Sequence, residues 1–298
     1  MNESGWIQTY IAPLVHAPGA LSLRDDVALL TADGPTLVTM DTLVEAIHFL
    51  PVDPLDTVGQ KLVRVNVSDV IAKGAAPVEA LLSIAWPRQR PEPEFQALMA
   101  GIERDLAAFE IALIGGDLVG TDGPLTLTLT LTGRCLAGAP IRRTTAEPGH
   151  TLWISGEIGW GGLGLNAAKA GGDDGAAQRY RVPEIGGLAE ARTVATHASA
   201  SMDVSDGLLL DLKRLADASE CGAVIDLGAI PLAVPTKQPH HIIAQCTSGD
   251  DYQILLSADP GDLVPGFTKI GALTESLGLS LTYQGQAVNA PSILGFEH

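Results

Sequence analysis

Apolar and polar positions recur with two different periods along the chain. Between Leu125 and Thr132 leucine alternates with threonine, which predicts a strand with one buried face. Between Glu94 and Phe109 apolar residues recur every three or four positions, the spacing of an amphipathic helix. Because strand-like and helix-like segments follow one another along the chain, an α/β (α+β) fold is favoured over a sandwich or a helix bundle.

Cap and turn residues predict further elements. Asp53 and Pro54 suit the start of a helix that Gly74 and Pro77 would end. Further strands are predicted at 27–30, 36–40, 80–86, 111–114, 151–155, 223–227 and 252–257, a third helix from 205 to near 222, and an irregular surface connection at 171–187.

The length of 298 residues predicts two domains. The stretch 137–149 is rich in glycine and proline, so we place the boundary there and expect domains at 1–138 and 139–298. Hydrophobic residues make up 46% of the chain, which excludes a disordered protein.

The chain is strongly acidic, with 18 lysines and arginines, 35 aspartates and glutamates, and a net charge of −17. This charge repels nucleic acid and anionic membranes, so neither is expected as a partner. An anionic ligand is still expected to bind where divalent cations lie between it and the protein.

Three widely spaced cysteines without a CxxC pair predict neither a disulfide framework nor a zinc site. The N-terminal residues lack the pattern of a signal peptide, and no apolar run has the length of a membrane span. These features favour the cytoplasm.

Many aspartates stand where predicted strands end or helices begin. Turns and helix caps explain any one of them, but several lie in apolar surroundings such as Met202-Asp203-Val204. Mg²⁺ takes a few carboxylate ligands and completes its shell with water and substrate phosphate, so the set indicates such a site. Its members are Asp25, Asp26, Asp41, Asp69, Asp117, Asp203, Asp206, Asp250 and Asp251.

Several motifs each allow two interpretations. Asn66 and Asp69 share a helix face that is either a solvated edge or a buried polar site. Gly115-Gly116-Asp117 fits a phosphate-binding turn or an ordinary glycine turn. The segment 203–207 fits a metal-bridged phosphate site at a helix start or a well-capped helix. His48 and Arg143 fit structural or solvated roles as well as ligand contacts.

The run from Gly159 to Gly164 matches the dinucleotide-binding pattern GxGxxG after a predicted strand. Glu184 lies at the distance of the acidic residue that such a site needs, but no strand is predicted before it. The match is therefore weak.

Taken in order and spacing, several segments resemble the thiamine-monophosphate kinases, of the superfamily that includes aminoimidazole-ribonucleotide synthetase. The resemblance runs nearly from end to end. Its segments are 25–30, 39–49, 65–77, 113–117, Arg143, 203–208, 248–252 and 295–298.

The resemblance implies a two-domain aminoimidazole-ribonucleotide synthetase-like fold. The N-terminal domain would hold a mixed sheet, bind ATP and metal, and form a homodimer, and the C-terminal domain would be α/β. The implied reaction transfers the γ-phosphoryl group of ATP to thiamine monophosphate, giving thiamine diphosphate. Several Mg²⁺ ions would neutralise phosphate charge and align an in-line attack, so no dedicated protein base is required.

The resemblance also implies three groups of site residues. Magnesium ligands would be Asp26, Thr39, Met40 through its backbone carbonyl, Asp41, Asp69, Asp117, Asp203 and Asp206. ATP contacts would be Gly116, Asp117, Arg143 and Ser205, and contacts to the thiamine substrate would be His48, Asp250 and Phe296.

The chain departs from the family pattern at four places, which bear on the acceptor more than on the nucleotide. Ser22-Leu23-Arg24 replace Gly-x-Gly, Met40 replaces threonine, Asp250 replaces glutamate, and Val182-Pro183-Glu184-Ile185 replace Pro-x-Pro-Arg.

Three alternatives stay open at this point. One is an ATP-using enzyme of the same superfamily with another acceptor. A second is a dinucleotide-binding oxidoreductase, which would depend on Gly159 to Gly164. The third is a non-catalytic binding protein.

Overall fold

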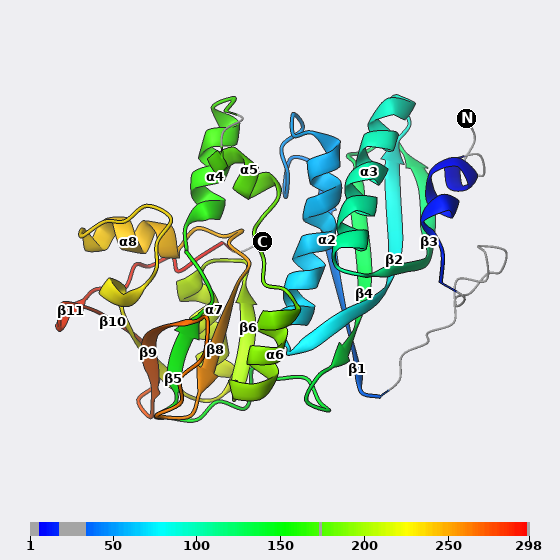
Figure 1. Ribbon diagram of the computed structural model, residues 1–298. Helices are drawn as coiled ribbons and strands as arrows, with labels where there is room; N and C mark the ends of the chain where they lie inside the picture. Colours follow the sequence, from blue (N-terminus) through cyan, green and yellow to red (C-terminus); the bar gives the residue numbers. More distant parts are fainter. Residues whose placement is uncertain (1–5, 18–33, 173–174, 297–298) are drawn as a thin grey trace. The chain divides into compact units, whose positions relative to one another are not determined.

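The computed structural model describes residues 6–17, 34–172 and 175–296. The chain divides into two compact units (Figure 1). The first contains residues 1–70 and 76–135, and the second contains 71–75 and 136–298. The predicted strand at 27–30 and the predicted metal ligand Asp26 lie outside the described residues.

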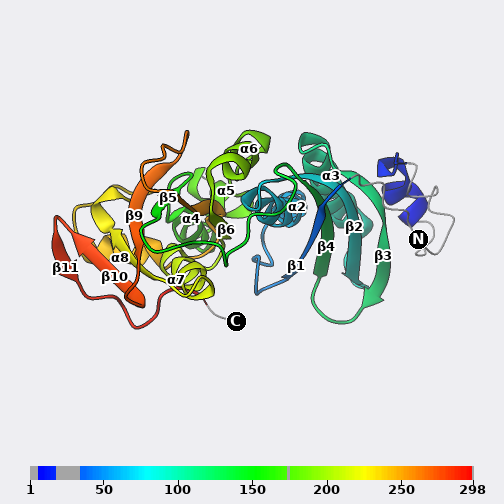
Figure 2. The same cartoon turned by 90° about the horizontal axis from the view of Figure 1, so that it is seen from below.

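The first unit is a four-stranded sheet in the order β1-β4-β2-β3, with α2 and α3 on one face (Figure 2). β1 pairs antiparallel with β4, and β2 pairs parallel with β3. The elements are η1 Ile7–Ile11, η2 Ala12–Leu14, β1 Thr36–Val44, α2 Leu55–Ala72, β2 Ala75–Pro87, α3 Glu92–Ala108, β3 Ala112–Thr121 and β4 Thr126–Cys135.

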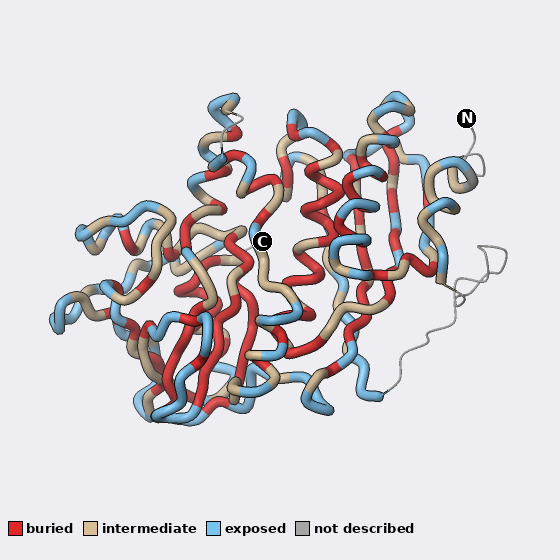
Figure 3. The backbone as a smooth tube through the Cα atoms, in the orientation of Figure 1, coloured by how far each residue is buried: buried red, intermediate tan, exposed pale blue. Residues whose placement is uncertain are grey.

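Burial follows the predicted periods in this unit. In β4 the side chains of Leu127, Leu129 and Leu131 are fully buried, while the threonines between them are half-buried. In α3 the apolar positions from Phe95 to Leu106 are buried as predicted. Figure 3 shows the buried segments along β2, β4 and α2.

The other face of this sheet carries exposed apolar side chains. Val38 and Met40 on β1 are 67% and 64% exposed, and Leu81 and Val119 on β2 and β3 are also exposed. Alternation along β1 directs these side chains away from the helices.

The second unit is a seven-stranded mixed sheet in the order β11-β10-β7-β9-β5-β8-β6. Its helix α7 packs on β6, β7 and β10. The strands are β5 Thr151–Ile154, β6 Ala200–Val204, β7 Gly222–Asp226, β8 Gln253–Ala258, β9 Thr268–Thr274, β10 Gly278–Tyr283 and β11 Gln286–Val288. The helices are α4 Trp160–Lys169, α5 Gly175–Arg181, α6 Leu188–His197, α7 Leu208–Ala218, η4 Leu227–Ala229 and α8 Pro239–Cys246.

The short segment 71–75 belongs to the second unit because its carbonyl groups accept hydrogen bonds there. Ser201 Oγ donates to the Ala72 carbonyl, and the N–H groups of Ile141 and Leu136 donate to Lys73 and Gly74 at 3.1 and 3.0 Å. The second unit is therefore discontinuous in sequence.

Two predicted local structures are wrong. The connection at 171–187 contains α5, a helix of seven residues. The predicted glycine turn at Gly115-Gly116-Asp117 lies inside β3, where a register shift opposite Ala80 and Leu81 marks a β-bulge. The strand therefore continues through the glycines, since the bulge absorbs one extra residue.

Glycines allow α2 and α3 to cross closely. A Cβ atom on Gly101 would lie 1.8 Å from the carbonyl oxygen of Asp56, and one on Gly59 would lie 2.4 Å from that of Leu98. Both obstacles are backbone atoms, so a side chain at either position requires the helices to move apart.

We expect Gly101→Ala to destabilise the protein. Alanine gains about 1 kcal/mol of helix propensity, but forced separation of packed elements costs typically 1–3 kcal/mol or more, and a clash with backbone lies at the upper end. Thermal unfolding should show a melting temperature several degrees lower. Gly175→Ala is the matched control, because nothing lies within 4 Å of its added Cβ; an equal effect of both substitutions would contradict the close crossing.

Candidate functional site

In the first unit, polar side chains of α2 lie against β1. Asn66 is fully buried, and its Oδ1 accepts the N–H of Asp41 at 3.0 Å while its Nδ2 donates to the Leu62 carbonyl at 2.9 Å. Thr39 Oγ1 donates to Asp69 Oδ2 at 2.5 Å. The pair Asn66 and Asp69 is thus a polar site between helix and strand, and it brings together three predicted metal ligands, Thr39, Asp41 and Asp69.

Met40, predicted to bind through its backbone carbonyl, stands between Thr39 and Asp41 on β1 and directs its side chain to the exposed face. Another predicted ligand of this unit lies on a different strand. Asp117 is exposed on β3, opposite Ser83 of β2. Its neighbour Gly116 is required by packing, because a Cβ there would lie 1.8 Å from the Leu82 carbonyl oxygen.

His48 closes a turn after β1. The ring Nδ1 of His48 accepts the backbone N–H of Val44 at 3.0 Å, and the backbone N–H of His48 donates to the Val44 carbonyl at 2.9 Å. The buried Lys61 donates to the His48 carbonyl at 3.1 Å. Because Nδ1 is an acceptor here, the neutral ring carries its proton on Nε2.

In the second unit, Asp203 lies in β6, and Ser205 and Asp206 lie in the turn between β6 and α7. Asp203 is buried at the end of the strand, and Ser205 and Asp206 are half-buried in the turn that follows. Gly207, with φ 119°, makes the turn into the helix.

Asp211 and Arg214 fix the position of Asp206. The fully buried Asp211 accepts the Asp206 N–H at 3.0 Å through Oδ2 and pairs with Arg214 at 2.9 Å through Oδ1. Arg214 also pairs with the Asp206 carboxylate. Burial raises the pKa of Asp211 to about 6, although the Asp206 N–H opposes the rise.

Backbone hydrogen bonds join this turn to two other segments of the second unit. The N–H of Asp250 donates to the Ser205 carbonyl at 2.8 Å, and the N–H of Phe296 donates to the Asp206 carbonyl at 2.9 Å. A Cβ on Gly249 would lie 2.6 Å from the Ser205 oxygen, so only glycine allows this approach. The predicted ATP contact Ser205, the predicted metal ligand Asp206 and the predicted substrate contacts Asp250 and Phe296 are therefore direct neighbours.

The GxGxxG run does not present its N–H groups to a ligand. Asp251 accepts the Gly159 N–H at 3.0 and 2.9 Å and the Gly161 N–H at 3.0 Å, and the Trp160 N–H also bonds to it. A Cβ on Gly161 would lie 2.1 Å from the Gly249 carbonyl. These glycines bring α4 close to the 249–251 loop, which argues against the oxidoreductase alternative.

Burial raises the pKa of Asp251 to about 7, while the hydrogen bonds from Gly161 and Gly159 oppose this rise. The side chain is 4% exposed. Asp251 is thus a buried internal group and not a ligand contact.

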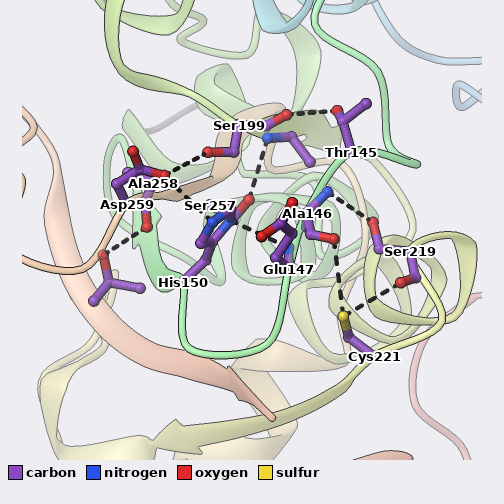
Figure 4. A network of polar contacts seen from close by, with 12 residues as sticks. Thr145, Ala146, Glu147, His150, Ser199, Ser219, Cys221, Ser257, Ala258 and Asp259 are labelled. Carbon is purple, nitrogen blue, oxygen red and sulfur yellow. Dashed lines mark hydrogen bonds and ion pairs between the residues drawn. The ribbon is translucent and has the colours of Figure 1, made fainter. Parts of the chain in front are cut away.

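Arg143 is exposed on the loop before β5. Figure 4 shows the contacts that Thr145 and Ala146 of this loop make with Ser199 and Ser219. Ser219 Oγ donates to the Arg143 carbonyl at 2.6 Å and accepts the Ala146 N–H at 3.1 Å. Thr145 Oγ1 donates to the Ser199 carbonyl at 2.5 Å. The loop that carries this predicted phosphate contact is held against the end of α7 and the start of β6.

The chemistry of the predicted donors fits Mg²⁺, because carboxylate, hydroxyl and carbonyl oxygens are its preferred ligands. Within the described residues, no three His, Cys, Asp or Glu side chains gather closely enough to hold a metal ion by themselves. The ligand roles stay predictions.

Sequence reasoning left the role of Asn66 open and grouped Asp251 with the candidate metal ligands, because the roles of both depend on which side of the backbone they face. It missed Asp211 and Arg214, which fix the position of Asp206. Asp211 and Arg214 have the helical spacing of a salt bridge, the one signal available for them.

Two family models match the chain. One, AIR synthase related protein, N-terminal domain, matches residues 24–135, and the C-terminal domain of the same group matches residues 147–267. Among the described residues, none of the helices has the length and apolar character that a membrane span needs.

Two curated relatives are similar in sequence to this chain over almost its whole length. "Thiamine-monophosphate kinase" of Caulobacter vibrioides is 38% identical over 100% of this chain and 91% of its own length. That of Escherichia coli K12 is 31% identical over 93% and 91%.

Solved structures give the same family and a wider fold group. AaThiL complexed with AMPPCP and TMP has a TM-score of 0.78 at 27% identity, covering 87% of this chain and 86% of its own. Escherichia coli HypE, a hydrogenase maturation protein, has a TM-score of 0.80 at 16% identity, covering 99% of both chains, and shows the fold alone. With two AIR synthase related domains and relatives matched along its whole length, the chain belongs to the thiamine-monophosphate kinase family.

Proposed function

We propose that this chain transfers the γ-phosphoryl group of ATP to thiamine monophosphate. Family membership supports this reaction. One observation in the second unit supports the choice of the residues that take part. Backbone hydrogen bonds join Ser205 and Asp206 with Asp250 and Phe296. Residues proposed for nucleotide and metal thus lie beside residues proposed for the acceptor, which is what direct transfer requires.

The nucleotide is proposed to bind through Mg²⁺, Gly116, Asp117, Arg143 and Ser205. Magnesium supplies charge neutralisation of the phosphates. The proposed carboxylate ligands are Asp26, Asp41, Asp69, Asp117, Asp203 and Asp206, with Thr39 Oγ1 and the Met40 carbonyl as neutral oxygens.

The acceptor is proposed to contact His48, Asp250 and Phe296. Phe296 is 52% exposed, so its ring is accessible to a flat heterocycle. Asp250 offers a carboxylate, which accepts hydrogen bonds from an aminopyrimidine. No general base is proposed, because positioning and charge neutralisation supply most of the catalysis in phosphoryl transfer.

A coupled assay of ADP release with ATP, Mg²⁺ and thiamine monophosphate tests the function. We expect turnover that depends on the acceptor, and thiamine diphosphate as the product by chromatography. ATP binding without such turnover would favour the alternative of another acceptor within the same superfamily.

Nucleotide binding is expected to require a divalent metal. Without it, the acidic residues repel the phosphates of ATP. Calorimetry should detect ATP binding in Mg²⁺ and at least tenfold weaker binding in EDTA, since loss of one charge-assisted contact alone is worth about 1.5–3 kcal/mol. Equal affinity in both buffers would contradict the metal-bridged site.

The same site predicts that Asp69→Asn lowers turnover by orders of magnitude, because it removes a charged ligand but keeps the side-chain volume. Asp217→Asn is the matched control, since Asp217 is exposed in an ion pair with Lys213. Unchanged kcat/KM in Asp69→Asn would remove this residue from the metal site.

We also propose a homodimer through the exposed face of the first unit's sheet. Val38 and Met40 of β1 and Leu81 and Val119 of β2 and β3 are exposed on one face of the sheet, with the threonines of β4 between the two groups. Exposed apolar side chains gathered on one face of a sheet are typical of a protein–protein interface. A second copy covers this face with the same residues, since a two-fold interface is self-complementary.

The double substitution Val38→Lys and Val119→Lys should therefore give a monomer. The symmetry places both added charges in the interface twice, and burying such unpaired charges is costly. The molar mass measured by light scattering after gel filtration should be twice the chain mass for the wild type and 31.0 kDa for the variant. Leu263→Lys, at a position 80% exposed outside this sheet, should leave the mass unchanged; a monomeric wild type would rule the dimer out.

A cytoplasmic location is the remaining proposal. Cys135, Cys221 and Cys246 are buried free thiols, and burial raises the pKa of each, which keeps them unreactive.

A further inference from the structure

Two residues with left-handed backbone flank the buried Asp251. Asp250 has φ 65° and Tyr252 has φ 51°. Aspartate adopts this conformation with little cost, but an aromatic residue rarely does. Such backbone persists where the surrounding structure enforces it, and it concentrates at functional sites.

The structure enforces it through three sets of hydrogen bonds. The Asp250 N–H donates to the Ser205 carbonyl at 2.8 Å, and the Tyr252 N–H donates to the Val204 carbonyl at 2.7 Å. Between them, Asp251 anchors the loop to Gly159 and Gly161 at the start of α4. The loop backbone is thus fixed on both sides of Asp251.

This backbone brings two side chains together. Tyr252 Oη donates to Asp250 Oδ1 at 2.9 Å, and Tyr252 is 8% exposed. In a regular strand, side chains two residues apart stand roughly parallel on one face, about 6.6 Å apart. The left-handed residues therefore have a specific result, a phenol hydroxyl bonded to one oxygen of the Asp250 carboxylate.

We propose that Tyr252 is a positioning residue that sets the Asp250 carboxylate for the thiamine phosphate acceptor. The inference rests on the proposed function, in which Asp250 contacts the acceptor. A carboxylate held in one rotamer loses less conformational entropy when the acceptor binds. Tyr252 acts through Asp250 and does not itself touch the substrate.

Tyr252→Phe removes the hydroxyl and keeps the ring. We expect the KM for thiamine monophosphate to rise roughly three- to tenfold, because a carboxylate that lacks this hydrogen bond is held less firmly in the orientation the acceptor needs. The KM for ATP and kcat should change little. Tyr283→Phe is the matched control, since Tyr283 is on β10, which β7, β9 and β5 separate from β8 in the sheet.

A double-mutant cycle separates positioning from a merely structural role. Asp250→Ala should raise the KM for thiamine monophosphate by roughly tenfold or more. In the Asp250→Ala background, Tyr252→Phe should have no further effect, because the group it positions is gone. Independent, multiplying effects would overturn the proposal.

Melting temperatures of the variants complete the test. A lower melting temperature in Tyr252→Phe with an unchanged KM for thiamine monophosphate would show that Tyr252 is structural only, and the proposal would fail. A wild-type protein that is folded but does not turn over thiamine monophosphate would overturn the proposed function itself. The two failures are thus distinguishable.

Discussion

A carboxylate buried away from water needs compensating donors, and Asp251 finds them in consecutive N–H groups at the start of α4. This interaction replaces the ligand that a helix N-terminus with a glycine pattern would otherwise suggest. It also sets the position of the residues on either side. With Asp251 fixed inside the unit, Asp250 and Tyr252 take a left-handed backbone, and their N–H groups donate to the turn after β6 and to the last residue of β6, respectively. The geometry of the candidate acceptor site thus depends on one buried carboxyl group.

Other buried carboxylates of this acidic chain also have hydrogen-bond donors or cations beside them. Asp211 is compensated by Arg214 and by the Asp206 N–H, and Asp105 is compensated by Arg64 and Gln60. These carboxylates have partners within the protein, so they shape the structure and are not available to a ligand. Composition alone does not distinguish such acids from metal ligands, which is why the net charge indicates a cation site without locating it.

Strongly periodic elements were predictable from the sequence. The alternation in β4 and the helical stripe in α3 depend on burial of every second residue or of one helix face, and both patterns are long enough to exceed chance. The later strands β9, β10 and β11 are short and carry exposed polar residues, so they give no comparable signal. α5 was missed because glycines surround it, and the turn predicted at Gly115-Gly116-Asp117 was wrong because a bulge in β3 has the same composition as a turn.

The candidate site was predictable as a set of residues and not as a geometry. Aspartates next to strand ends indicated the relevant loops, and the family resemblance assigned roles to them. The sequence does not show which of the neighbours Asp250 and Asp251 is buried, because left-handed backbone at Asp250 and Tyr252 breaks the regular alternation of an extended chain. Asn66 was recognised as sharing a face with Asp69, but its burial depends on β1, which is distant in sequence.

The discontinuity of the second unit has a consequence for how this protein is made. Its segment 71–75 leaves the ribosome long before residues 136–298, whose Leu136, Ile141 and Ser201 bond to the carbonyl groups of that segment. In a nascent chain, this segment of the second unit is therefore present while the first unit forms and before the rest of the second unit is made. The two units are for this reason not exchangeable modules. A recombination event that replaced residues 136–298 as a block would leave behind the short piece on which that block folds.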